Sequence, residues 1–403
     1  MSKKKSNHTL LIPEAGAGPE RFPALLFSQP EGARQAHFEH CLIEHPFLAE
    51  ACTAVQHAIC MPGEDAIYRR KASMVLVIGP SRVGKTTLIH LLEEDLLLRA
   101  KPRMQEDPGY IPFVSITSDG SGRGRFEWKD DYLSILRQLP APFLQMKKPA
   151  TSTRDLCAAT EEALTHRKTE VIIVAEAHHL AKAAWSGRRL QDHLDHLKYF
   201  ENKMGVSHVL VGTYAMRPFR TGNAQLACRS VDVHFPRYDA TQEPERAIFK
   251  SVLWALQRQR PLPKEPALLH HWECLYARSL GCVGLLKHHL NQALKLALSE
   301  QADTVTASPL RRTALHKEKV DLALEAILDG EKDFCEPEDA DLCLLVKLGM
   351  RHPSPSESLV KTGPPPHPDG SAKSGERAPG RDPVGMREME QEGNQHEESR
   401  VAG

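Results

Sequence analysis

The stretch Met74–Thr86, MVLVIGPSRVGKT, joins a run of apolar residues to a glycine-rich turn. Its first part, Met74–Ile78, predicts a short buried β-strand, and the leucine-rich residues Thr86–Leu98 that follow predict a helix. The turn between them has the spacing GxxxxGK[ST]. Glycines at these places let backbone N–H groups point inward at a phosphate, and the helix directs its positive N-terminus at the same anion. The stretch therefore predicts a phosphate-binding loop between a strand and a helix.

Each residue type in this loop has a chemical role. Lys85 has the length to reach the β and γ phosphates of a nucleotide, and the Thr86 hydroxyl is a suitable ligand for Mg²⁺. We therefore expect ATP and Mg²⁺ as cofactors. The expected nucleotide-binding residues are Gly79, Pro80, Ser81, Arg82, Val83, Gly84, Lys85, Thr86 and Thr87.

Further apolar runs alternate with helical patterns in the centre of the chain. The expected strands, besides the first, are Pro112–Thr117, Val171–Val174, His208–Gly212 and Val231–Phe235. The expected helices between them are Trp128–Gln138, Thr153–Thr165, Leu190–Lys203 and Asn223–Cys228. Short apolar strands that alternate with helices are typical of an α/β protein with a parallel, doubly wound sheet.

The rest of the chain divides around this α/β core, which we expect to span residues 71–240. Strand patterns stop near Glu243, and amphipathic helices predict a helical lid domain over 241–330. Residues 1–35 are expected to be extended, 36–70 a helical lead-in, and 331–350 a connector. Residues 351–403 contain eight Pro, seven Gly and no aromatic residue, so we expect a disordered tail.

Composition excludes several classes of protein. Lys and Arg together number 52, as do Asp and Glu, which argues against a uniformly basic nucleic-acid coat protein but not against a local basic patch. No apolar run reaches the roughly 18 residues of a membrane span. The nine cysteines form no CxxC pair, which indicates a reduced, cytoplasmic protein without structural zinc. His37 and His40, with Cys41, have a spacing that suits metal ligands on one helix face, but chance explains such pairs among 21 histidines.

An acid is expected at the end of a strand near the phosphate loop. The run Val171–Val174 is followed by Ala175 and Glu176, where the common pattern is Asp-Glu. In that pattern the Asp orients the Mg²⁺ shell and the Glu polarises the attacking water. Glu176 is therefore the expected catalytic acid, or else a residue that merely caps the loop. Because Ala175 offers no oxygen, we expect ATP binding with weak hydrolysis.

Three further residues are candidates for the same site. Thr213 follows the fourth expected strand, which places a hydroxyl near the γ-phosphate. Arg229 precedes the fifth strand, where it could stabilise charge on a neighbouring subunit's γ-phosphate, or be a solvated surface residue. Lys287 lies at the start of a lid helix and could fold back onto the phosphates, or be an ordinary exposed lysine.

Together these motifs resemble the AAA+ ATPases that assist DNA transposition, the TniB/TnsC group, which is distantly related to MuB. The resemblance extends over about Phe38 to Leu328. The segments that carry it are GPSRVGKT, VAEAHHL, FEWKDDYLSILRQL, HVLVGTY, QLACRSVDVHFPRY and GCVGLLKHHLNQAL.

The resemblance implies an AAA+ P-loop ATPase that binds ATP and assembles as a homo-oligomeric ring or filament on duplex DNA. It also implies recruitment of a transposase to a target, together with a target-selection factor. By analogy, Lys85 and Thr86 bind phosphate and Mg²⁺, Glu176 is catalytic, Thr213 is a sensor and Arg229 an arginine finger. Ala175, where that group has Asp, departs from the pattern and makes hydrolysis the open question.

Contacts with the DNA backbone need only a local stripe of basic residues, because polymerisation multiplies the contacts. Arg123 and Arg125, in a glycine-rich loop, and Lys147 and Lys148 are candidates, although they could equally be solvated loop charges. No signature of sequence-specific reading is present. The main hypothesis is therefore an ATP-dependent, DNA-binding regulator of transposition. The alternatives are an ATP-sensing signalling or chaperone-like switch without DNA binding, and a nucleotide-binding scaffold without turnover.

Overall fold

The computed structural model describes residues 9–11, 20–59, 73–118, 128–139, 152–183, 187–222 and 227–350 of the chain. It divides into two units, Met1–Glu336 and Pro337–Gly403, and each is described by itself. Four expected DNA-contacting residues and the expected disordered tail, 351–403, lie outside the described residues. These four residues are Arg123, Arg125, Lys147 and Lys148.

The centre of the first unit is a five-stranded parallel sheet with the order β4-β5-β6-β3-β7. The strands are β3 (Met74–Ile78), β4 (Phe113–Thr117), β5 (Val171–Ala175), β6 (Ser207–Gly212) and β7 (Ser230–His234). Each agrees with an expected strand to within one residue at either end. The expected α/β class with a parallel sheet is thus confirmed, and the phosphate loop follows β3, which lies between β6 and β7.

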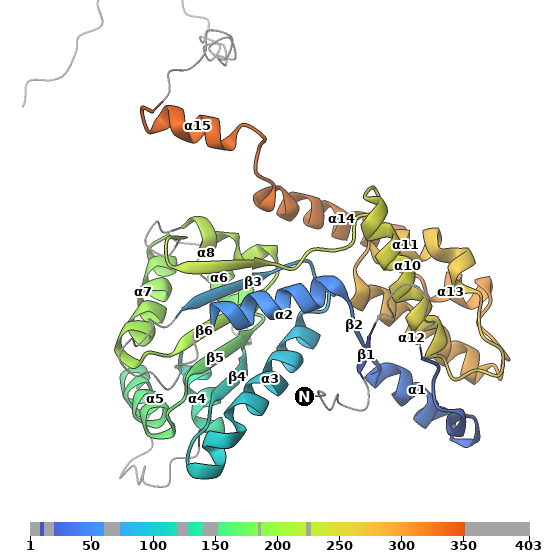
Figure 1. Cartoon of the computed structure of the whole chain (residues 1–403), viewed down its shortest axis with the longest axis horizontal. Coiled ribbons are helices and arrows are strands. Elements are labelled where there is room, and N and C mark those ends of the chain that lie inside the picture. Colours follow the sequence, from blue (N-terminus) through green and yellow to red (C-terminus); the bar gives the residue numbers. More distant parts are fainter. Residues whose placement is uncertain are drawn as a thin grey trace, which may run out of the picture. The chain divides into compact units, whose positions relative to one another are not determined.

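Alternate residues of β3 face opposite helical layers. Val75 and Val77 pack with α2 (Pro46–Ala58) and α3 (Lys85–Glu106), which lie side by side over one face of the sheet (Figure 1). Leu76 and the other even-numbered residues of β3 pack against the opposite layer. That layer contains α4 (Trp128–Gln138), α5 (Thr153–Arg167), α6 (His178–Ala183), α7 (Gly187–Met204) and α8 (Arg217–Thr221). Because both faces are covered, the central strands are mostly apolar, whereas the edge strand β7 has exposed residues at Val231 and Asp232.

Local signals in the sequence explain where several helices begin and end. The Ser152 hydroxyl accepts a hydrogen bond from Asp155 N at 3.1 Å and so caps the start of α5. Lys168 adopts a left-handed conformation at the end of the same helix. Pro46 is the first residue of α2, a position where its missing N–H costs nothing.

A second core holds the helical lid together. Figure 1 shows the lid helices grouped beside the α/β core. They are α10 (Glu243–Arg258), η3 (Leu268–His271), α11 (Trp272–Ser279), α12 (Val283–Ser299), α13 (Ala307–Thr313) and α14 (Lys317–Glu331). The N-terminal helix α1 (Glu31–His40) joins this core through the fully buried Phe38. The expected helical lead-in, residues 36–70, contains the end of α1 and all of α2, which have different partners: α1 packs on the lid and α2 on the sheet. Helix α1 begins at Glu31, so part of the segment 1–35 that was expected to be extended is helical.

Short elements complete the first unit. Strand β1 (Thr9–Leu11) pairs in parallel with β2 (Leu42–Glu44), which follows α1. The 3-10 helices are η1 (Ala24–Ser28), η2 (Tyr214–Met216) and η4 (Lys332–Phe334).

The end of the lid is fastened to the α/β core by what we name the C-terminal clasp, residues 329–334 with Arg217, Arg220 and Arg237. The Arg217 guanidinium forms a bidentate ion pair with Asp333, and Arg220 donates to the Asp333 backbone carbonyl at 2.8 Å. Arg237 Nε donates to Glu331 Oε1 at 2.9 Å. Paired arginine and carboxylate groups of this geometry are among the more specific polar contacts in proteins.

The second unit contains one described helix, α15 (Ala340–Lys347). Within the described ranges, no helix combines the length and the hydropathy that crossing a bilayer requires.

Candidate functional site

The phosphate loop, Gly79–Gly84, connects the end of β3 to the start of α3. The backbone takes a positive φ at two positions in the loop, 63° at Arg82 and 128° at Gly84, between residues with negative φ. Such alternation turns successive N–H groups toward one centre, which makes a concave anion site. Gly79 is required for another reason: a Cβ there would lie 2.1 Å from the carbonyl oxygen of Phe235.

Lys85 supplies the positive charge of this site. It is the first residue of α3, is 8% exposed, and its Nζ donates to the carbonyl oxygens of Gly79 and Pro80 at 3.1 and 2.7 Å. Burial lowers the pKa of Lys85 to about 8, and the charge of Glu176 opposes that shift. A desolvated lysine at a helix N-terminus without acidic residues in its first turn is suited to hold an anion.

Two of the expected residues lie at the same edge of the sheet as the loop. Glu176 follows β5 and Thr213 follows β6, and the order β5-β6-β3 places all three strand ends side by side. Gly79 N donates to Gly212 O at 3.3 Å, which fixes the loop to the end of β6. The structure thus brings Lys85, Glu176 and Thr213 together at one edge.

Glu176 is held in an unusual conformation. Its φ is 53°, and its carboxylate, 47% exposed, lies 3.2 Å from Nδ1 of the buried His178. A left-handed backbone at a residue other than glycine is uncommon and is often found at functional sites. The preceding residue, Ala175, ends β5 beside Thr117 of β4 and presents no oxygen from its side chain.

Beside the loop is a cavity of about 320 Å³, named here the base-side cavity. Its walls come from the α1–β2 turn, the phosphate loop with the start of α3, and the first turn of α12. Gly84 and Thr87 line it, so the cavity is continuous with the phosphate loop. The lining of the cavity also includes Glu39, Cys41, His45, Gly284 and Lys287.

Two buried titratable groups of this cavity, His45 and Cys41, are uncharged at neutral pH. Burial lowers the pKa of His45 to about 4, and its Nδ1 lies 2.8 Å from the Tyr238 hydroxyl. Burial also raises the pKa of the Cys41 thiol to about 11. The site therefore has a cationic end at Lys85 and a partly apolar cavity in which His45 and Cys41 are neutral and the Lys287 ammonium is bonded to backbone carbonyls, which suits a ligand with an anionic tail and an uncharged head group.

The lid contacts the phosphate loop directly. Leu285 N, in the first turn of α12, donates to Arg82 O at 3.0 Å. At Gly284 a Cβ would lie 2.5 Å from the same carbonyl oxygen. The close approach of the two backbones is possible only because residue 284 has no side chain.

Sequence reasoning expected Lys287 to fold back onto the phosphates, whereas the structure engages its Nζ elsewhere, and it expected Arg229 to act on a neighbouring subunit's γ-phosphate. Lys287 lines the base-side cavity, and its Nζ donates to the backbone carbonyls of Glu39 and Cys41. Arg229 is exposed and precedes β7, whose first residue pairs with Met74 at the start of β3. Since the strands are parallel, Arg229 lies at the sheet edge opposite the phosphate loop, a strand length of roughly 16 Å away.

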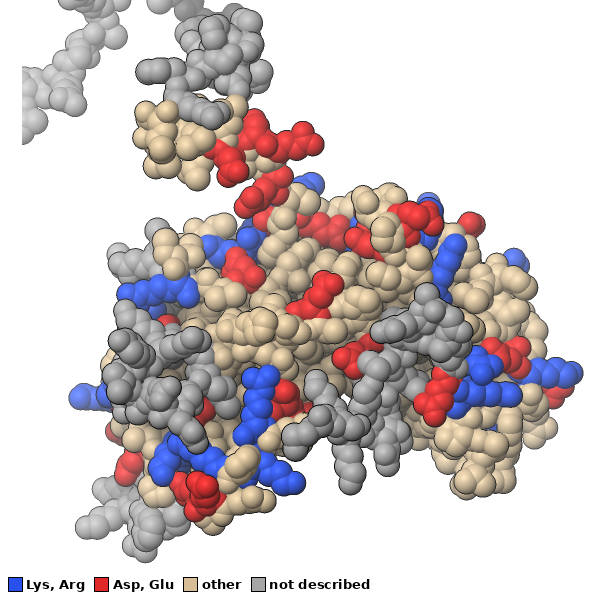
Figure 2. Space-filling view, viewed as in Figure 1, with Lys and Arg blue, Asp and Glu red and all other residues tan. Residues whose placement is uncertain are grey.

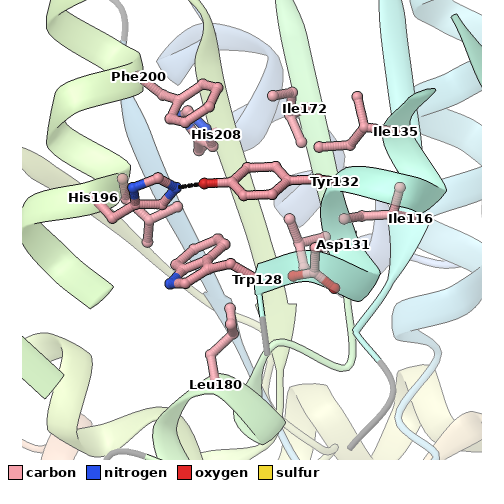
Figure 3. Close-up of a pocket in the computed structure, with 12 residues that line it drawn as sticks. Ile116, Trp128, Asp131, Tyr132, Ile135, Ile172, Leu180, His196, Phe200 and His208 are labelled. Carbon is pink, nitrogen blue, oxygen red and sulfur yellow. Dashed lines mark hydrogen bonds between the residues drawn. The ribbon is translucent and has the colours of Figure 1, made fainter. Parts of the chain in front are cut away.

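The described part of the first unit contains two further cavities away from the base-side cavity. One, of about 20 Å³, lies under α4 and α7, where Tyr132 and His196 form a hydrogen bond among apolar and aromatic side chains (Figure 3). It has room for a single water molecule. A larger one, of about 570 Å³, lies between Thr213, Ser81 and helix α14 and belongs to the same strand-end edge. Among the described residues, no group of three or more His, Cys, Asp or Glu side chains could hold a metal ion.

The α1–β2 wall and the C-terminal clasp were not foreseen from the sequence. Neither contains a recognisable motif. Their only signals were the buried positions around Phe38 and the arginines Arg217 and Arg220 shortly after Thr213.

Comparisons with known proteins agree with this geometry. Residues 68–218, less than half of the chain, match the family model described as an AAA domain. No curated protein matches the chain. The region therefore carries an AAA domain, and the fold is that of an α/β AAA+ P-loop ATPase.

The solved structures that match this chain share little sequence with it. The Aeropyrum pernix ORC2 protein in its ADP form is 14% identical with a TM-score of 0.46, and the match covers 66% of this chain and 66% of that one, just under two thirds. Drosophila ORC bound to DNA is 14% identical with a TM-score of 0.40, over 86% of this chain and 79% of that one. The Thermotoga maritima RuvB Holliday junction branch migration motor is 15% identical with a TM-score of 0.38, over 77% and 83%.

The contact between Gly284 and Arg82 leads to a prediction. We expect Gly284→Ala to lower the free energy of unfolding by about 1–3 kcal/mol, because the methyl group forces α12 away from the phosphate loop. Chemical denaturation measures this change. Gly32→Ala, in helix α1 with no atom within 4 Å of the new Cβ, is the matched control and should be neutral or slightly stabilising. Equal stability of the two variants would contradict the packing described here.

Proposed function

We propose that this chain binds ATP with Mg²⁺ and assembles on duplex DNA as an AAA+ regulator of transposition. One observation carries the nucleotide part: a buried lysine, a strand-end glutamate and a strand-end threonine meet at one edge, beside a partly apolar cavity. The base-side cavity would hold the adenosine, and the phosphate loop would hold the phosphates. Lys85 would contact the β and γ phosphates, and the Thr86 hydroxyl would be the protein ligand of Mg²⁺.

Hydrolysis would depend on Glu176. Its carboxylate, at the sheet edge beside Lys85, is positioned to orient and deprotonate an attacking water, while Thr213 donates its hydroxyl toward the γ-phosphate. Mg²⁺, when bound, would neutralise charge on the β and γ phosphates. The Ala175 side chain contributes no oxygen to orient the metal's water ligands, which supports slow turnover with intact nucleotide binding.

Restoring the missing oxygen tests this explanation. We expect Ala175→Asp to raise the rate of Mg²⁺-dependent phosphate release by roughly tenfold or more, because a carboxylate fixes the metal's water shell. Single-turnover phosphate release measures the rate. Ala175→Asn, of the same shape without the charge, is the matched control and should give a smaller gain. Equal rates for the natural chain and Ala175→Asp would show that another acid already orients the metal.

The lowered pKa of Lys85 predicts how nucleotide affinity depends on pH. Phosphates bind the lysine cation, which is lost as the pH rises through about 8, so affinity should be highest below pH 8 and fall by up to about tenfold per unit above it. Cys282, which also acts on Lys85, stays neutral in this window because burial raises its pKa to about 12. Titrations with a fluorescent ATP analogue from pH 7 to 10 measure the fall. Lys85→Arg keeps its charge, so its affinity should be nearly constant; a parallel decline in both proteins would refute the assignment.

Oligomerisation would give Arg229 its role. An exposed arginine at the edge opposite its own phosphate loop cannot act on its own nucleotide, but it is free to enter the site of a neighbouring copy. There it would stabilise charge that develops on the γ-phosphate. The resemblance to the TniB/TnsC group supports this assignment, together with assembly on duplex DNA and partnership with a transposase and a target-selection factor.

The charge of the described surface favours the alternative, an ATP-sensing switch without DNA. Figure 2 shows basic side chains next to acidic ones at the lower left of the view. Arg99 pairs with Asp95 at 2.7 Å, and Lys168 pairs with Asp107 at 2.7 Å. Paired cations of this kind contribute little to binding phosphates. In our proposal the DNA contacts come from Arg123, Arg125, Lys147 and Lys148.

Assembly on DNA separates the two functions. We expect the full chain to form large complexes on duplex DNA of unrelated sequences with ATP or a slowly hydrolysed analogue, and not without nucleotide, as measured by electron microscopy and sedimentation. Arg229→Ala should bind ATP normally yet lose at least tenfold of the DNA-stimulated turnover. Arg154→Ala, which removes another exposed arginine, is the control. Absence of nucleotide-dependent assembly would exclude the role in transposition and leave the switch.

A further inference from the structure

Lys287 connects two walls of the base-side cavity. It lies in the second turn of α12, and its Nζ donates to Glu39 O at 2.7 Å and to Cys41 O at 2.6 Å. Glu39 belongs to the last turn of α1, and Cys41 connects α1 to β2. The lysine therefore ties a lid helix to a segment nearly 250 residues earlier in the chain.

The two carbonyls need such a donor. The last four carbonyl groups of a helix have no partner within the helix. In α1 the Cys41 N–H satisfies His37 O at 3.0 Å, and Lys287 reaches Glu39 O together with the carbonyl that follows the helix. A cation at this end also interacts favourably with the helix dipole. Lys287 thus serves as the C-terminal cap of α1, although it belongs to another helix.

This arrangement engages the lysine away from the phosphates. Burial lowers the pKa of Lys287, and the negative charge of Glu39 opposes that shift. Two of its three N–H donors are used by backbone carbonyls. Turning the side chain onto a phosphate would leave the part-buried carbonyl of Cys41 without this donor, which costs free energy.

We propose that Lys287 is a positioning residue for the nucleobase and not a phosphate ligand. This inference rests on the proposed binding of ATP. By holding the α1–β2 turn against α12, Lys287 keeps the width of the base-side cavity fixed, so that no binding energy is spent on ordering that wall. The phosphate end of the site, built from residues 79–87, does not depend on this contact.

Two kinds of ligand separate the roles. A residue that fixes the wall of the cavity changes the affinity of every ligand that has an adenosine group, whatever its number of phosphates. A phosphate ligand acts on every polyphosphate, whether or not it has a base, and most strongly on the γ-phosphate. ATP, ADP and inorganic tripolyphosphate therefore give different patterns in the same variant.

The experiment measures the affinity of these three ligands by calorimetry for the full chain and its variants. We expect Lys287→Met to weaken ATP and ADP by the same factor, about tenfold or more, since a charge-assisted hydrogen bond is lost. Tripolyphosphate should bind as it does to the natural chain. Lys287→Arg, which can donate to the same carbonyls, should restore most of the affinity. Lys295→Met removes an exposed lysine of the same helix and is the matched control.

Several results would overturn the proposal. A loss of tripolyphosphate affinity in Lys287→Met, or a larger loss for ATP than for ADP, would show direct contact with phosphate. If Lys287→Met does not fold, Lys287→Gln is the milder substitution, and hydrogen exchange at residues 37–44 reports whether Lys287 fixes this wall: exchange there must rise, and unchanged protection refutes it. If the natural chain binds tripolyphosphate but neither adenine nucleotide, the proposed function itself is wrong; if it binds ATP, only the role of Lys287 is at stake.

Discussion

The phosphate loop is confined by backbone on two sides, and the rest of the site depends on that confinement. The carbonyl of Phe235, at the end of β7, lies against Gly79, and the carbonyl of Arg82 lies against Gly284 of the lid. Neither position has room for a Cβ atom. A loop held between the sheet and a lid helix keeps its N–H groups oriented before any ligand arrives, which reduces the entropy lost on binding.

This confinement also explains the state of Lys85. A buried ammonium group is costly unless polar partners surround it, and here two carbonyls of the loop take that place. The cost that remains is visible as the lowered pKa of Lys85. A bound anion offsets this desolvation cost, so the folded protein is more stable when the loop is occupied. Binding and stability are linked through this one residue.

The fold was predictable from sequence because its signals are local. Apolar runs of five or six residues and a motif of fixed spacing determine the strands, the loop and the start of α3, and parallel topology then brings Glu176 and Thr213 to Lys85. The position of Lys287 was not predictable, because its partners belong to a segment nearly 250 residues away. A basic residue at a helix start gives no sign of which distant carbonyls it will meet. The same limit applies to the C-terminal clasp, because the sequence around its arginines does not indicate which distant carboxylates they will contact.

The C-terminal clasp changes the mechanics of the lid. Residues 235–242 connect the lid to the α/β core, and this connection alone would leave the lid free to rotate about a single hinge. The Arg217–Asp333 ion pair and the hydrogen bond from Arg220 to the Asp333 carbonyl add a second attachment, so the lid is held to the core at both of its ends. Arg217 follows Thr213 by four residues, and the clasp ends shortly before Pro337, where the second unit begins. A displacement of the strand-end threonine therefore has a short path through Arg217 and Asp333 to the end of the lid that bypasses the phosphate loop.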